Sequence, residues 1–231
     1  GTDQVASLTT KQVLNLSNTQ LNNLTTVQVV ALTTEQVTTL TTKQLSSLAS
    51  KLIAALETDD LASLTTAQTA GLTSAQVGSL TTAQVSALTT LQISKLSSVQ
   101  LAGLSSTQIR AMETDDLVTL TTAQLSKLTT AQLQGLRTAQ RAEITTAQLN
   151  GLSTLQISAL STLQVAGLSA DQLSNLKTAQ IASLTSAQIA ALETVDLVEM
   201  TTAQIQSLKT SQLIGLTTAQ LSVMTTIQLA K

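Results

Sequence analysis

The chain has 231 residues, of which 42% are hydrophobic and 10% charged, and it contains no aromatic residue, proline, cysteine or histidine. The missing cysteine excludes disulfides and thiolate chemistry. A net charge of -2 without a basic patch argues against nucleic acid or an anionic membrane surface as a partner. No apolar run approaches the roughly 20 residues that a membrane-spanning helix needs, so no membrane insertion is expected.

An aliphatic residue recurs at every eighth position from Leu8 to Met224, without insertion or deletion. We call this residue position zero of an octad, and residues 80–87 (Leu-Thr-Thr-Ala-Gln-Val-Ser-Ala) are a typical octad. Position two is almost always Thr or Ser, position four is mostly Gln, position five is aliphatic, and position seven is commonly small. This strict period predicts one continuous array over residues 1–231, and its in-phase ends are expected of a segment of a longer array.

The period of eight does not suit a continuous helix. At about 100° per residue, the aliphatic position would rotate by about 80° from one octad to the next, so no single face could be buried. The helix must therefore break once per octad. Such short helices cannot stand alone, which predicts an all-α solenoid of very short capped helices.

A β-solenoid is the alternative architecture. The Thr pair and the β-branched residue at position five suit strands, and repeated Gln side chains could form an interior amide ladder. Against it, positions five and eight have opposite parity, so they would face opposite sides of a straight strand.

The Thr pair offers two places for the helix cap. With position one as N-cap, Thr-x-x-Gln forms a capping box, whereas with position two as N-cap the helix begins one residue later. Position two stays Thr or Ser, while position one accepts residues that cap poorly, namely Ala49, Glu57, Glu113, Arg137, Lys177, Glu193 and Lys209. We therefore predict the cap at position two, which gives a helix over Ala83–Ala87 plus Leu88, with Val85 and Leu88 pointing inward.

The repeated Gln is predicted to be structural. Its amide both donates and accepts, so it can satisfy backbone groups left open between successive short helices. The small residue at position seven is expected to permit close approach of successive coils.

Several octads depart from the pattern, in chain order. Lys51 and Leu52 replace the usual pair at positions three and four, which we interpret as a surface change with one lost Gln. Arg141 replaces the inward aliphatic residue at position five. We expect its stem to cover the local defect in the core and its charged end to reach water. Lys177, Glu193 and Lys209 all occupy position one and stand two octads apart, so they would form an ion-pair column if two octads made one turn.

Three octads change in a coupled way: wherever position one is Glu, position four is Asp. The pairs are Glu57 with Asp60, Glu113 with Asp116, and Glu193 with Asp196. One interpretation is a calcium site at a turn, aided by Asp59 or Asp115. The other is that the acids suit a helix start. The spacing lacks the glycine-punctuated pattern of strong calcium loops, which favours the second interpretation.

The residues of an enzyme are missing from this composition. Without His or Cys no nucleophile–base pair can be assembled, and there is no glycine-rich phosphate loop or soft metal cluster. We therefore expect no enzyme activity, no catalytic, cofactor-binding or metal-binding residues, no cofactor and no small-molecule substrate.

Runs such as residues 120–125 (Leu-Thr-Thr-Ala-Gln-Leu) and 191–194 (Ala-Leu-Glu-Thr) resemble the octapeptide repeat tracts of giant bacterial surface or secreted proteins, which are often labelled adhesin-like. The resemblance implies an extracellular or cell-surface structural segment: a stalk, a spacer or a filament subunit. Self-association, end to end or as a fibre, is the expected partnership. The alternative is a binding module that uses its regular Thr rows on ice or another surface.

Overall fold

A computed structural model describes residues 1–226 of the chain. Residues 227–231, which include Gln228 and Leu229 of the last octad, lie outside the described part. Residues 1–226 form 28 short helices and no strand. The fold is therefore the predicted all-α solenoid of one short helix per octad, and the β-solenoid alternative is wrong.

The contacts divide the chain into two units, Gly1–Leu120 and Thr121–Lys231, which are described separately. The helices of the first unit are α1 (Thr2–Ala6), α2 (Thr10–Leu14), α3 (Asn18–Asn22), α4 (Thr26–Val30), α5 (Thr34–Thr39), α6 (Thr42–Ser47), α7 (Ser50–Ile53), α8 (Thr58–Ser63), α9 (Thr66–Ala70), α10 (Ser74–Gly78), α11 (Thr82–Ala87), α12 (Thr90–Lys95), α13 (Ser98–Ala102), α14 (Ser106–Ala111) and α15 (Thr114–Thr119).

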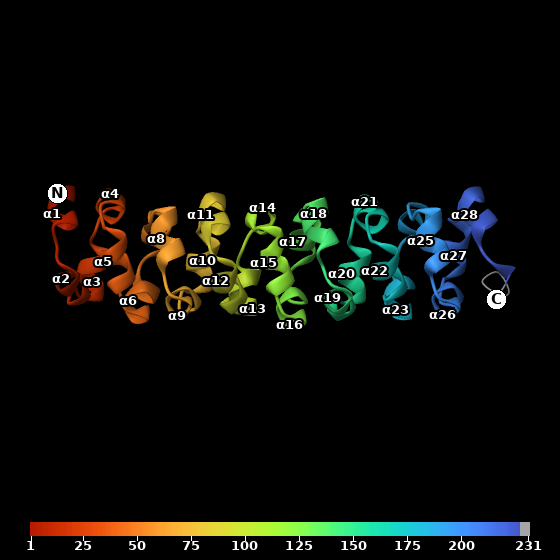
Figure 1. Cartoon of the computed structure of the whole chain (residues 1–231), viewed down its shortest axis with the longest axis horizontal. Helices are drawn as coiled ribbons and strands as arrows, with labels where there is room; N and C mark the ends of the chain where they lie inside the picture. Colours follow the sequence, from red (N-terminus) through yellow and green to blue (C-terminus); the bar gives the residue numbers. More distant parts are fainter. Residues whose placement is uncertain (227–231) are drawn as a thin grey trace. The chain divides into compact units, whose positions relative to one another are not determined.

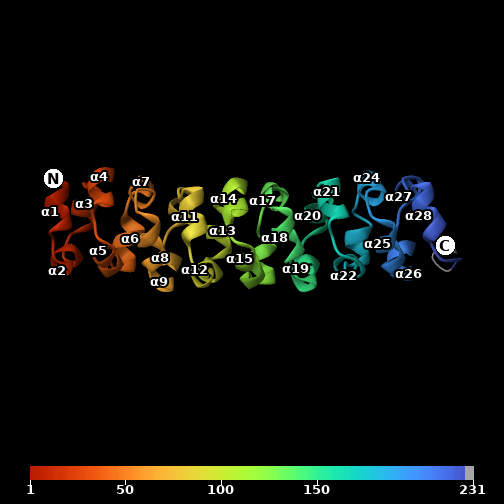
Figure 2. The same cartoon turned by 45° about the horizontal axis from the view of Figure 1, so that its top comes forward.

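The second unit repeats the same plan. Its helices are α16 (Thr122–Leu125), α17 (Thr130–Gly135), α18 (Thr138–Ala142), α19 (Thr146–Gly151), α20 (Thr154–Ser158), α21 (Thr162–Ala166), α22 (Ala170–Ser174), α23 (Thr178–Ile181), α24 (Ser186–Ala190), α25 (Thr194–Glu199), α26 (Thr202–Gln206), α27 (Thr210–Ile214) and α28 (Thr218–Val223). Within each unit the helices follow one another along one direction (Figures 1 and 2). No helix among the described residues is long and apolar enough to cross a bilayer.

The predicted helix start was wrong by one residue. In α11 the N-cap is Thr81, at position one, and the helix begins at Thr82. The Thr81 hydroxyl accepts a hydrogen bond from the backbone N–H of Gln84 at 3.1 Å, and the Gln84 Oε1 accepts the backbone N–H of Thr81 at 2.8 Å. This is the capping box that the prediction rejected.

Each octad returns to extended backbone at or close to its aliphatic position, as α11 illustrates. Leu88 adopts φ -61° and ψ 136°, and its N–H still bonds to the Val85 carbonyl. Leu88 is 4% exposed and Val85 is fully buried, so both point inward as predicted. Positions zero and five therefore line one continuous aliphatic core in each unit, which supplies the stability that such short helices lack.

A coil of the solenoid takes between three and four octads. The helices that pack together most extensively are three apart, such as α10 with α13 and α22 with α25. The side-chain amide of Gln92 reaches the carbonyls of Leu61 and Leu64, which are 31 and 28 residues earlier. Successive coils are therefore related by an offset close to 28 residues.

Candidate functional site

The side chain of Gln84 joins two coils. Its Oε1 is held by the N-cap N–H of Thr81, as described above, and its Nε2 donates to the carbonyl oxygens of Ala54 at 3.1 Å and Leu56 at 2.6 Å. Those two carbonyls follow helix α7, in the preceding coil. Gln84 is 3% exposed and its bond to the Leu56 carbonyl is buried, where an unmade hydrogen bond costs most.

The same arrangement recurs within each unit, and we call it the glutamine ladder. In every member, Nε2 donates to backbone carbonyls 28 to 31 residues earlier. The members include Gln36, Gln44, Gln68, Gln76, Gln84, Gln92, Gln100 and Gln108 in the first unit, and Gln156, Gln164, Gln172, Gln180, Gln188, Gln204, Gln212 and Gln220 in the second. The predicted structural role of the repeated Gln is confirmed by these bonds.

Positions two and seven meet across the same interface. The position-seven hydroxyl of Ser79 donates to the carbonyl of Ser50, at position two of the preceding coil, over 3.1 Å. A Cβ added to Gly71 would overlap the Cγ2 of Thr42, and one added to Gly103 would lie 2.8 Å from the carbonyl oxygen of Ser74. The small residue at position seven therefore permits close coils, as predicted, and position two has a packing role that has nothing to do with capping.

The octad with Leu52 at position four lacks the usual Gln, and a side chain from another octad caps its helix instead. Leu52 is fully buried and cannot accept the N–H of Ala49. That N–H is instead accepted by Oδ1 of Asn22 at 2.7 Å, and Nδ2 of Asn22 donates to the Ser47 carbonyl at 2.9 Å. The expected surface change is therefore an interior one, with an asparagine of the preceding coil in place of the missing glutamine.

Arg141 donates to a carbonyl that a ladder glutamine would otherwise reach and does not extend into water, so the sequence prediction for it was wrong. It is 8% exposed, and its Nη1 donates to the Leu136 carbonyl at 2.8 Å. By the usual ladder offset Gln164 would reach that carbonyl, but Gln164 bonds to the carbonyls of Leu133 and Gln134. Burial lowers the pKa of the Arg141 guanidinium.

The acidic octads place their Asp where the ladder has Gln. Oδ1 of Asp60 accepts a hydrogen bond from Oγ1 of Thr34 at 2.8 Å, and Oδ2 is buried without a partner. Oδ2 of Asp116 accepts the N–H of Glu113 at 2.9 Å. Burial raises the pKa of the Asp116 carboxyl, and hydrogen bonds from Thr90 and Glu113 oppose that rise.

Asp196 is the exception among the three acids. Thr34 precedes Asp60 by 26 residues, and Thr90 stands at the same offset before Asp116. The residue at this offset before Asp196 is Ala170, which has no hydroxyl. Asp196 is 7% exposed, and no group among the described residues donates a hydrogen bond to its carboxylate. Burial raises its pKa, and the nearby charge of Glu193 raises it further.

A cavity of about 240 Å³ opens beside this pair of carboxylates. It is lined by Ala142, Ala166, Gly167, Leu168, Ser169, Gln172, Glu193 and Asp196. Among residues 1–226, no three acidic, histidine or cysteine side chains gather as a metal cluster, so any cation here would also need backbone oxygens.

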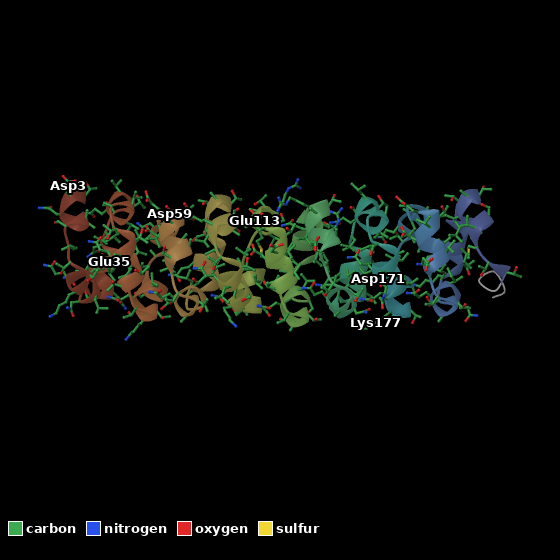
Figure 3. All side chains as sticks on the ribbon, viewed as in Figure 1. Asp3, Glu35, Asp59, Glu113, Asp171 and Lys177 are labelled. Atoms are coloured by element: carbon green, nitrogen blue, oxygen red, sulfur yellow. The ribbon has the colours of Figure 1, made fainter. Side chains whose placement is uncertain are left out.

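The exposed charges do not form the expected column. Lys177 and Glu193 are two octads apart, which is more than half of a coil, so they do not stack. The Nζ of Lys177 instead donates to the Asn150 carbonyl at 2.8 Å. Figure 3 labels Asp59, Asp171 and Lys177 among the charged residues, and all three are exposed. These charges therefore lie on the outside of the coils.

The sequence prediction named no catalytic, cofactor or metal residues, and it missed the roles of Asn22, Arg141 and Ala170. One signal was available for the last: Ala170 is one of two exceptions to Thr or Ser at position two. Recognising its meaning requires the offset between coils that pairs Thr34 with Asp60, which the sequence does not give.

The sequence profile of the ALTTAQ repeat matches residues 53–90, 109–146, 141–178 and 189–226, together more than half of the chain. A search of curated proteins finds no match.

Proposed function

The chain belongs to the ALTTAQ repeat family, and we propose that it serves as a non-catalytic structural spacer in a bacterial surface or secreted protein. The glutamine ladder is the observation that carries this proposal. Because each coil binds the one before it through the same side-chain bonds, coils can be added without a new kind of contact. The resemblance to surface-protein repeat tracts supports an extracellular or cell-surface location.

The same ladder supports self-association as the proposed partnership. One side of a coil offers Gln amide donors, and the other side offers the carbonyls that accept them. Such complementary faces are heterologous, so copies that meet through them would join head to tail.

The Thr rows favour the spacer over the ice- or surface-binding alternative. The position-one hydroxyls that such a surface would present are engaged as caps, as Thr65, Thr73 and Thr81 are with the N–H groups three residues on. Their placement follows from the capping box, so regular spacing of Thr needs no ligand to explain it.

Insertion of consensus octads tests the spacer proposal. Seven consensus octads, about two coils, would be inserted between Leu80 and Thr81, and small-angle scattering would compare the variant with the parent. The spacer proposal expects the longest dimension to rise while the cross-sectional radius stays constant. Growth of the radius of gyration with only about the 0.38 power of chain length, as in compact domains, would contradict it.

A further inference from the structure

We propose that the cavity beside Glu193 and Asp196 binds a calcium ion, held by the two carboxylates and by backbone carbonyls of the preceding coil. Asp196 stands at position four, where a ladder glutamine such as Gln188 donates to the carbonyls of two residues in the preceding coil. By the same offsets, the carbonyls facing Asp196 are those of Leu168 and Ala166, and both residues line the cavity.

The cavity gathers two carboxylates, and the side-chain donors on its wall are the hydroxyl of Ser169 and the amide of Gln172, which is bonded to the Ile144 carbonyl. Asp196, a residue that is 7% exposed, presents a carboxylate that has no hydrogen bond from the described residues, and Glu193 brings a second carboxylate at the exposed mouth. In every ladder octad, an amide donor fills the equivalent place. A buried, unpaired carboxylate is costly, and a cation is the ligand that these carboxylate and carbonyl oxygens would share.

The choice of cation follows from the ligand set and the space. Calcium takes six to eight oxygen ligands in flexible geometry, and backbone carbonyls are common among them, whereas magnesium demands near-ideal octahedral geometry. A cavity of about 240 Å³ has room for an ion that keeps several waters, since a water occupies roughly 30 Å³ in the liquid. With only two carboxylates, we expect a dissociation constant of roughly 10⁻⁴ to 10⁻³ M.

The other two acidic octads explain why one site is expected per chain. Asp60 receives the hydroxyl of Thr34 at Oδ1, while its Oδ2 is buried without a partner, and Asp116 receives the hydroxyl of Thr90, so each of these carboxylates has one side-chain donor from the preceding coil. Ala170 removes that donor at Asp196. The guanidinium of Arg141, about two coils before Asp196, lies near the cavity, because its Nη2 would stand 3.8 Å from a Cβ on the lining residue Gly167, but it is held by the Leu136 carbonyl and by Thr138.

The test is titration of the full chain, stripped with EDTA, with calcium chloride in a calorimeter. We expect one ion per chain and a rise in melting temperature by circular dichroism. Asp196→Gln should abolish binding while restoring the consensus octad, which keeps the fold. Ala170→Thr keeps both carboxylates but supplies the missing hydroxyl, and it should weaken binding severalfold.

Asp60→Gln is the matched control and should leave calcium binding unchanged. A titration without heat or melting shift at millimolar calcium would overturn the proposal, as would binding that survives in Asp196→Gln. An equal melting shift from sodium chloride at the same ionic strength would also overturn it, because a screening effect needs no site.

Discussion

The Nε2 of Gln84 lies 2.6 Å from the carbonyl oxygen of Leu56, 28 residues earlier, while its Oε1 accepts the N–H of Thr81. One side chain thus caps its own helix and ties it to the preceding coil.

Gln84→Leu should destabilise the protein, because the buried Leu56 carbonyl and the part-buried Thr81 N–H would both lose their partner. Each unsatisfied buried group costs about 1–3 kcal/mol. Urea denaturation followed by circular dichroism measures the change. Ala83→Gln, on the exposed face of the same helix, is the control and should stay within about 0.5 kcal/mol of the parent. Equal stability of Gln84→Leu and the parent would refute the structural role.

Asn22→Ala should destabilise the first unit by about 1–3 kcal/mol, because it leaves the N–H of Ala49 without its acceptor. Leu52→Gln in the Asn22→Ala background should recover part of this loss by restoring the ladder side chain. A double-mutant cycle over Asn22 and Leu52 measures the coupling. Additive effects of the two substitutions would show that Asn22 does not replace the missing Gln.

Gly78→Ala should lower stability by about 1–3 kcal/mol through overpacking, although alanine is the better helix former. The added Cβ would lie 2.6 Å from the backbone oxygen of Gly103, which a side-chain rotation cannot relieve. Gly71→Ala is the comparison, because its clash is with a methyl group of Thr42. Thr42→Ser removes that methyl group and should therefore restore the melting temperature lost in Gly71→Ala. An equal loss of melting temperature in Gly71→Ala with and without Thr42→Ser would contradict this packing.

Stability should fall as pH rises above about 4 in EDTA, because burial raises the folded-state pKa of Asp196 over its unfolded value of about 3.9. Between these two pKa values the folded chain binds more protons, so the free energy of unfolding is highest below the unfolded value and is lost as pH passes the folded one. Asp196→Gln should remove this component. Urea midpoints of parent and variant that stay parallel from pH 3 to 7 would contradict it.

The fold was predictable from the octad because a period of eight forces a break in any helix that must bury one stripe. The helix start was not predictable, and the reason lies in what positions one and two of the octad do. Where position four is Gln, the N–H of position one is capped by Gln Oε1 even when position one is a poor N-cap, as at Lys177 and Lys209, so tolerance there did not mean that no cap was present. The constancy of position two reflects packing between coils, as between Thr42 and Gly71.

Features that depend on the size of the coil were out of reach of the sequence. The ion-pair column assumed two octads per turn, whereas a coil takes between three and four. Asn22 and Arg141 each make a hydrogen bond that a position-four Gln makes elsewhere. These roles can be recognised only when the residues that neighbour each other in successive coils are known. The acidic pairs were found from their coupled change, but the difference between Asp60 and Asp196 depends on Thr34 and Ala170 in the preceding coil.

Hydrogen exchange of the glutamine side-chain amides tests the central claim most directly, since it observes the ladder donors themselves by nuclear magnetic resonance. We expect the Nε2 protons of buried members such as Gln84 and Gln204 to exchange far more slowly than those of Gln206, which is exposed. Exchange of Gln84 and Gln204 as fast as that of Gln206 would show that the coils are not joined by these bonds.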